Sequence, residues 1–206
     1  PKIKNQKEDF LFVNLGKTST FLLHEISKPI KRITPDSASF HSDIEQIKET
    51  LTIAQALRNN DIKIKEPTNF KLNDLVNAGL DQYRGYIEHL QIKIKNEIPK
   101  EAEVYVDLKY FKLVLDNLIK NAIEATIEIE EKEQRLISIQ YQDKTLSISN
   151  PFMTTVPLSE IFDPIKTTKE GNMGVGLYIS NFICQNLSWK LKMATHKKIF
   201  TASLSF

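Results

Sequence analysis

The sequence predicts an all-α helical hairpin, which forms a four-helix bundle on dimerisation, followed by an α+β domain built as a two-layer sandwich. Three observations lead to this fold class. Residues 1–60 contain a single glycine and no convincing strand pattern. Residues 67–206 alternate between helical and strand periodicity. The chain of 206 residues is also long enough for two small domains.

The hairpin is assigned to residues 1–62 because apolar side chains recur there at helical spacing. In its second half these side chains form a narrow apolar seam, which consists of Ile44, Ile47, Leu51, Ala54 and Leu57. Two helix-start signals, Thr34-Pro35-Asp36 and His41-Ser42-Asp43, indicate a turn within residues 34–43. One hairpin has too little core to fold alone, so we expect a homodimer in which a second copy completes the bundle.

The second domain is assigned to residues 67–206, after a linker at 62–68 that contains Pro67. Its expected helices are 72–90, 108–126 and 175–186, and its expected strands are 91–98, 104–107, 136–142, 145–150, 189–195 and 199–206. Asp107 stands where it can cap the helix at 108–126. This order of elements predicts a mixed or antiparallel sheet with helices on one face.

Composition argues against several functional classes. Lysine and arginine total 28 and aspartate and glutamate 26, so a net charge of +2 gives no support for a nucleic-acid partner. The single cysteine, Cys184, excludes an internal disulfide and fits a reducing compartment. No cluster of cysteine and histidine has zinc-ligand spacing. The chain begins at Pro1 without an initiator methionine, and we expect it to be part of a longer protein.

Two asparagines on the helix at 108–126 form the first candidate site. Asn117 and Asn121 are four residues apart, which puts both on one face, one turn from each other. A neutral amide oxygen is a hard ligand that suits Mg²⁺, and neighbouring side chains could meet a nucleotide carried by that ion. The alternative is a solvated helix face, on which asparagine is common.

A glycine-rich segment forms the second candidate site. Gly171-Asn172-Met173-Gly174-Val175-Gly176-Leu177 opens a helix, and the N–H groups of a helix N-terminus attract phosphate. Upstream, the segment Lys166-Thr167-Thr168-Lys169 offers hydroxyls and ammonium groups to phosphate oxygens. A glycine turn that merely caps a helix, preceded by a solvated loop, is the alternative.

The third candidate is His24, which Glu25 follows directly in the first helix. A carboxylate can orient an imidazole and take its proton, which makes the ring a better nucleophile. Pro29 should kink the helix nearby and free these side chains for reaction. The alternative is an exposed His–Glu pair without a role. The remaining histidines are expected to be structural or surface residues, namely His41, His89 and His196.

The order of these features resembles the catalytic core of sensor histidine kinases, over nearly the whole chain. The segment from His24 to Pro29 resembles the phosphoacceptor box of that family, and the segment from Leu115 to Thr126 is a close match to its asparagine box. The segment from Ile161 to Lys169 resembles the phenylalanine box of the nucleotide lid. The segment from Gly174 to Ile179 is similar to the second glycine box.

This resemblance implies ATP-dependent autophosphorylation of His24, with Glu25 as general base and Asn121 as the protein ligand to Mg²⁺. The ATP-binding residues that it implies are Asn117, Lys120, Asn121, Asn150, Thr168, Lys169, Gly174, Gly176 and Leu177. The phosphoryl group would then pass to an aspartate of a response-regulator receiver domain. The resemblance also implies a cytoplasmic kinase core, whose parent protein could be anchored in the inner membrane through a region upstream of Pro1.

Three features depart from the family pattern. Ser149-Asn150-Pro151-Phe152 stands where the family has an Asp-x-Gly-x-Gly box. The neutral side-chain oxygen of Asn150 would therefore have to accept the hydrogen bond from the adenine amino group that the Asp carboxylate accepts in the family. Lys28 stands where the family commonly has the Thr or Asn that serves phosphatase activity. The lid between Asn150 and Gly171 is also short.

Two alternatives stay open, the first because of the altered segment at Asn150 and the second because related proteins of the same ATP-binding superfamily hydrolyse ATP. A degenerate kinase could act as a phosphotransfer or nucleotide-binding module. A gyrase- or chaperone-like ATPase would carry a water-activating Glu where Asn117 stands, which favours the kinase.

Overall fold

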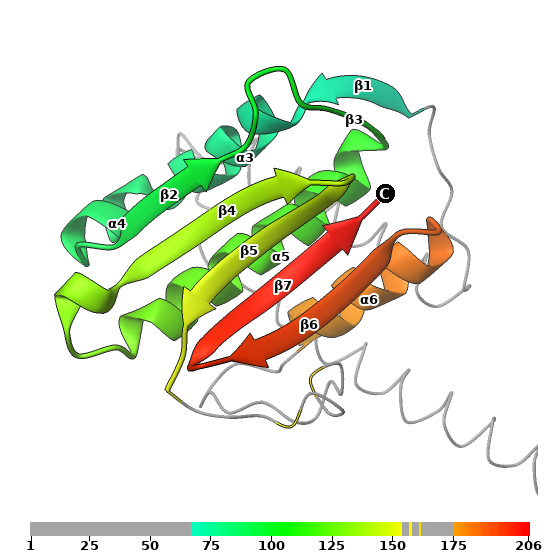
Figure 1. Cartoon of the computed structure of the whole chain (residues 1–206). Helices are drawn as coiled ribbons and strands as arrows, with labels where there is room; N and C mark the ends of the chain where they lie inside the picture. Colours follow the sequence, from blue (N-terminus) through cyan, green and yellow to red (C-terminus); the bar gives the residue numbers. More distant parts are fainter. Residues whose placement is uncertain (1–66, 154–156, 158–160, 162–174) are drawn as a thin grey trace, which may run out of the picture.

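The computed structural model describes residues 67–153, 157, 161 and 175–206. They form an α+β domain in which helices cover one face of a mixed sheet (Figure 1). The α+β prediction for the second domain is therefore confirmed. The predicted hairpin at 1–62 and its dimer lie outside the described residues and stay predictions.

The five-stranded sheet has the order β2-β4-β5-β7-β6, and a separate pair joins β1 to β3. The strands are β1 (Thr68–Lys71), β2 (Lys93–Glu97), β3 (Glu103–Val106), β4 (Leu136–Gln142), β5 (Thr145–Pro151), β6 (Lys190–His196) and β7 (Ile199–Ser205). Strand β2 runs parallel to β4, and every other pair is antiparallel. The long excursion between β2 and β4 carries helix α5 (Leu108–Ile127), as a parallel connection requires.

Helix α5 lies against the sheet and contacts both α3 (Leu72–Asp81) and α6 (Val175–Asn186). Its buried positions recur every three to four residues: Tyr110, Phe111, Val114, Leu115, Leu118, Ile119, Ala122, Ile123 and Thr126. The predicted cap is confirmed, because the Asp107 carboxylate accepts hydrogen bonds from the backbone N–H groups of Lys109 (3.0 Å) and Tyr110 (3.5 Å).

Arg135 closes the other end of α5. Its guanidinium donates to the backbone oxygens of Ile129 (2.8 Å), Leu90 (2.9 Å) and Ile127 (3.4 Å). The carbonyls near a helix C-terminus lack partners within the helix and attract a cation. One side chain therefore joins the end of α5 to the end of α4 (Arg84–His89), just before β4 begins.

Two local predictions were wrong. The helix expected at 72–90 is two helices, α3 and α4, because Tyr83 leaves helical geometry (φ −109°, ψ 9°). Its backbone N–H bonds to the oxygen of Leu80 in a tight turn, and its hydroxyl reaches Asp116 on α5. The linker expected at 62–68 also overlaps β1, which pairs with β3 and brings Phe70 against the core.

The face of the sheet opposite the helices is polar. Along its centre, three hydroxyl pairs join β5 to β7 at 2.8–3.0 Å: Thr145 with Ser205, Ser147 with Ser203, and Ser149 with Thr201. The inward positions of the same strands are apolar and buried, for example Leu146, Ile148 and Leu204. This alternation puts the core between the sheet and the helices, on the side where α5 and α6 meet.

None of the helices in the described ranges, 67–153 and 175–206, combines the length and the hydropathy that a membrane span needs. Cys184 is free and fully buried in α6, and burial raises the pKa of its thiol to about 12.

Two helical glycines, Gly85 in α4 and Gly79 in α3, should respond oppositely to larger side chains. Gly85 in α4 has open space around its Cβ position, so Gly85→Ala should stabilise the domain by about 0.5–1 kcal/mol through helix propensity. Gly79 in α3 is buried, and a Cβ there would lie 2.9 Å from Cδ1 of Ile119. Gly79→Leu should therefore destabilise by about 1–3 kcal/mol through overpacking. Urea unfolding of both variants checks this, and equal shifts would contradict it.

Candidate nucleotide-binding site

Asn117 joins the two helices that carry the predicted nucleotide site. Its amide Nδ2 donates to Oγ of Ser180 (3.3 Å) and to the backbone oxygen of Gly176 (3.4 Å). Both partners lie in the first half of α6, and Ser180 is fully buried. Asn117 of the asparagine segment and Gly176 of the second glycine segment, far apart in sequence, are thus neighbours.

Gly176 lies within α6, one residue after the helix begins. The sequence suggested that this glycine forms a turn, but the geometry gives a different reason for a glycine at this position. A Cβ at position 176 would approach Oδ1 of Asn117 to 3.0 Å and Cγ to 3.4 Å, which is closer than most real Cβ contacts. The absent side chain leaves room for the asparagine amide.

Asn121 follows Asn117 by one turn of α5 and is half-buried, as is Lys120. Among the residues that the structure describes, none hydrogen-bonds to the side-chain amide of Asn121. Its oxygen therefore suits a hard cation such as Mg²⁺. No group of three or more His, Cys, Asp or Glu side chains that could hold a metal occurs within the described part of the chain.

Asn150 is buried at the end of β5, on the inward face that packs toward α5. Its Nδ2 donates to the backbone oxygen of Pro151 at 2.8 Å. This bond fixes which end of the amide is the nitrogen, because a carbonyl can only accept. The side-chain oxygen keeps its capacity to accept a hydrogen bond, which is what contact with an adenine amino group would need.

On another side of α5, Asp116 accepts a hydrogen bond from the Tyr83 hydroxyl at 2.8 Å. Burial raises the pKa of Tyr83 well above its usual range, and the hydrogen bond to Asp116 and the negative charges of Asp116 and Glu124 raise it further. Tyr83 consequently stays protonated and donates at all ordinary pH values. Asp116 precedes Asn117 in sequence, so this bond links α5 to the turn between α3 and α4 close to the candidate site.

The structure brings together only part of the predicted set. Asn117 and Gly176 touch, while Leu177 follows in α6 and is half-buried. His24, Glu25, Thr168, Lys169 and Gly174 lie outside the described residues.

Sequence reasoning missed Ser180 and Tyr83. The signal for Ser180 was present, because it lies four residues after Gly176 and therefore on the same helix face.

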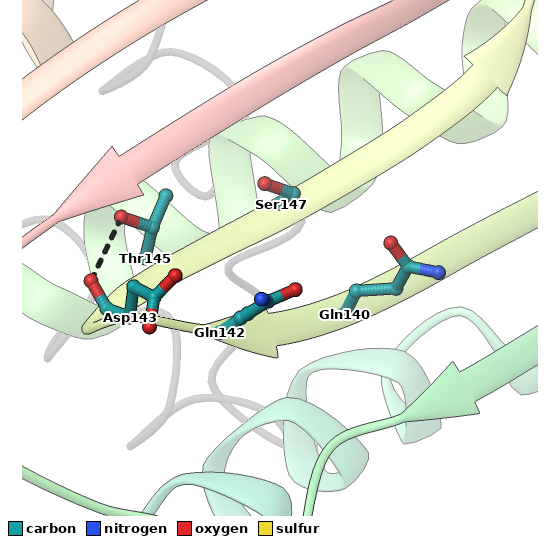
Figure 2. A pocket seen from close by; sticks show the side chains of 5 residues that line it. All are labelled: Gln140, Gln142, Asp143, Thr145 and Ser147. Atoms are coloured by element: carbon teal, nitrogen blue, oxygen red, sulfur yellow. Dashed lines mark hydrogen bonds between the residues drawn. The ribbon is translucent and has the colours of Figure 1, made fainter.

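A hollow on the polar face of the sheet is lined by Gln140, Gln142, Asp143, Thr145 and Ser147 (Figure 2). In Figure 2 the Thr145 hydroxyl donates to the backbone oxygen of Asp143, at 3.4 Å. These side chains belong to the β4–β5 hairpin. Asn117 and Gly176 lie on the helical side of the sheet, so this hollow does not contain these predicted residues.

The sequence of the domain matches a known family. Residues 106–206 match the family model described as the GHKL domain. The sensor protein kinase PilS of Pseudomonas aeruginosa is 22% identical over 211 residues, covering 90% of this chain and 39% of PilS. The sensor histidine protein kinase HK06 of Streptococcus pneumoniae is 34% identical over 117 residues, covering 52% of this chain and 25% of HK06. The chain thus spans less than half the length of either relative.

The fold matches a solved structure of the same kind. The catalytic domain of histidine kinase ThkA superposes with a TM-score of 0.55 at 25% sequence identity. The match covers 68% of this chain and 94% of that domain.

Removing the Tyr83 hydroxyl should cost stability in a pH-dependent way. Tyr83→Phe should lower the free energy of unfolding by about 1–2 kcal/mol at pH 7, because a hydrogen bond to a carboxylate is lost. Since folding raises the pKa of Tyr83, this contribution is complete below pH ~10 and declines as the pH rises further. The difference in the free energy of unfolding between the wild type and Tyr83→Phe should therefore become smaller above pH ~10.

Urea unfolding at neutral and alkaline pH measures this difference. Tyr86→Phe is the matched control, because Tyr86 is 64% exposed and should show no effect at either pH. If the loss of unfolding free energy in Tyr83→Phe stays constant with pH, the hydrogen bond from Tyr83 to Asp116 does not make the assigned contribution.

Proposed function

We propose that the chain is the catalytic core of a sensor histidine kinase, because residues 106–206 match the GHKL domain model and the proteins that the chain resembles include sensor kinases. In this proposal ATP phosphorylates His24, and the phosphoryl group passes to an aspartate of a response-regulator receiver domain. One observation carries it: the amide of Asn117 on α5 is hydrogen-bonded to the first turns of α6. This contact brings Asn117 and Gly176, which belong to the two segments that resemble nucleotide-binding boxes, next to each other and so supports a shared site.

The nucleotide would lie between α5 and the start of α6. Asn117 and Lys120 would contact its phosphates. Lys169, Gly174 and Gly176 would hold the phosphate tail, with Thr168 and Leu177 beside it. Asn150 supports adenine recognition through its side-chain oxygen, since its nitrogen is already engaged by Pro151. An amide acceptor lacks the charge of the aspartate usual in the family, so the adenine contact depends on hydrogen-bond geometry alone.

Mg²⁺ would be held by the amide oxygen of Asn121, whose half-buried position on the same helix face as Asn117 supports this role. When bound, the ion would neutralise charge on the phosphates. Asn117 and Asn121 would position the γ-phosphate. The imidazole of His24 would attack the γ-phosphorus while the bond to the β–γ bridging oxygen breaks and ADP leaves, and Glu25 would take the proton of the ring. Positioning and charge neutralisation account for most of the catalysis in phosphoryl transfer.

The proposal extends to the rest of the chain. Residues 1–62 form the dimerising phosphotransfer hairpin, and residues 67–206 form the catalytic domain. The homodimer forms through the hairpin, and the receiver domain docks beside His24. The core works in the cytoplasm, as part of a parent protein anchored in the inner membrane. The match to PilS, a sensor protein kinase, covers 90% of this chain and so extends beyond the GHKL domain, which supports a kinase core over both regions.

A degenerate kinase that only binds nucleotide or relays phosphoryl groups is the second candidate. The observation that favours it is the segment Ser149-Asn150-Pro151-Phe152, which lacks the charge and both glycines of the family box. The buried Asn150 amide, whose oxygen can accept a further hydrogen bond, favours the active kinase instead.

Incubation of the chain with γ-labelled ATP and Mg²⁺ tests the proposal. We expect acid-labile, base-stable label on the protein, because phosphohistidine has that stability. His24→Gln should abolish the label, while the matched control His196→Gln, at an exposed position of β6, should keep it. Asn121→Asp should also abolish labelling, since it alters the proposed metal ligand.

Other results would overturn the assignment. Label that persists in His24→Gln would exclude His24 as the acceptor. Release of phosphate without labelled protein would indicate a gyrase-like ATPase. Nucleotide binding without either product would indicate the degenerate kinase.

A further inference from the structure

We propose that Ser180 is a positioning residue for nucleotide binding, which acts by holding the amide of Asn117. This inference rests on the proposed function, because it assigns Asn117 to the phosphates. Ser180 itself would touch neither nucleotide nor metal. Its hydroxyl would set the rotamer in which Asn117 meets the ligand.

The hydrogen-bond geometry defines the orientation of the Asn117 amide. The backbone oxygen of Gly176 can only accept, so the nitrogen of the amide must face it. Oγ of Ser180 accepts from the same nitrogen at 3.3 Å. Two acceptors one helical turn apart thus hold one NH₂ group, and the amide oxygen is left with its accepting capacity.

Burial explains why a hydroxyl at this position needs a partner. Ser180 has no exposed surface, and its neighbours Ile179, Ile183 and Cys184 in α6 are buried too. A buried hydroxyl without a hydrogen bond is costly, and an apolar residue would fill the position at lower cost. Within the described ranges, Asn117 is the side chain that hydrogen-bonds to Ser180. The polar pair is therefore best explained by what it does for Asn117.

Gly176 also restrains the amide of Asn117, through its lack of a side chain. Because Gly176 has no Cβ, Oδ1 of Asn117 has room beside it, whereas the Cβ of an alanine at this position would lie 3.0 Å from that oxygen. Ser180 and Gly176 together confine the amide, one by a hydrogen bond and one by shape. Loss of either restraint should leave Asn117 free to adopt other rotamers, so that nucleotide binding must pay the entropy of ordering it.

The test is ATP binding by the full chain, measured by calorimetry, together with the KM and kcat of autophosphorylation. Ser180→Ala should raise the Kd and the KM for ATP roughly 3- to 10-fold, the range expected for one lost hydrogen bond, with kcat changed less than about twofold. Gly176→Ala should raise the Kd in the same direction. Thr126→Val is the matched control, because Thr126 is a fully buried hydroxyl on α5 that bonds to the oxygen of Ala122. It should leave the Kd unchanged.

A double-mutant cycle separates positioning from a general effect on the fold. In the Asn117→Ala background, Ser180→Ala should have no further effect on the Kd, because the group that it holds is gone. An additive effect there would overturn the proposal, as would an equal loss in Thr126→Val. ATP binding that is unaffected by Ser180→Ala would also overturn it and leave the proposed function intact. Failure of the wild type to bind ATP would overturn both.

Discussion

Helix α5 is buried along one side and polar along the other, and the rest of the domain is arranged around that division. Its apolar positions contact the sheet and α3, while Asp116, Asn117 and Lys120 lie on surfaces that are only half-buried. A helix whose apolar stripe is this continuous has one favourable rotation against a sheet. The same packing that forms the core therefore fixes the direction in which the asparagines point. Rotating α5 to move them would expose a row of aliphatic side chains.

Strong periodicity explains which elements were predictable. Strand β4 and helix α6 have the expected bounds, and α5 differs by one residue, because each has a repeated apolar pattern and a clear boundary signal. The break between α3 and α4 was missed because it depends on a bond from Tyr83 to a residue 33 positions away. Strand β1 was missed because its four residues are mostly exposed and gain their strand conformation by pairing with β3.

The residue types of the candidate site were predictable from the sequence, but their arrangement in space was only partly predictable. The spacing of Asn117 and Asn121 on one helix followed from sequence, and so did a glycine at the start of α6. The pattern did not distinguish a glycine that bends the backbone from one that makes room for a neighbour, and Gly176 is of the second kind. That distinction requires knowing that α5 and α6 are adjacent, which is a tertiary fact.

The order of strands has a consequence for how the domain behaves near other copies of itself. Strands β2 and β6 are the two edges of the main sheet, and an open edge offers unpaired backbone groups to any passing strand. Lys93 and Lys95 on β2, and Lys190 and Lys192 on β6, are all exposed. At the β6 edge a second copy would bring like charges together, so edge-to-edge addition is disfavoured there, whereas on β2 Lys95 already pairs with Glu97 at 2.8 Å. Copies of the domain that lie close together are therefore kept from extending one another's sheet through β6.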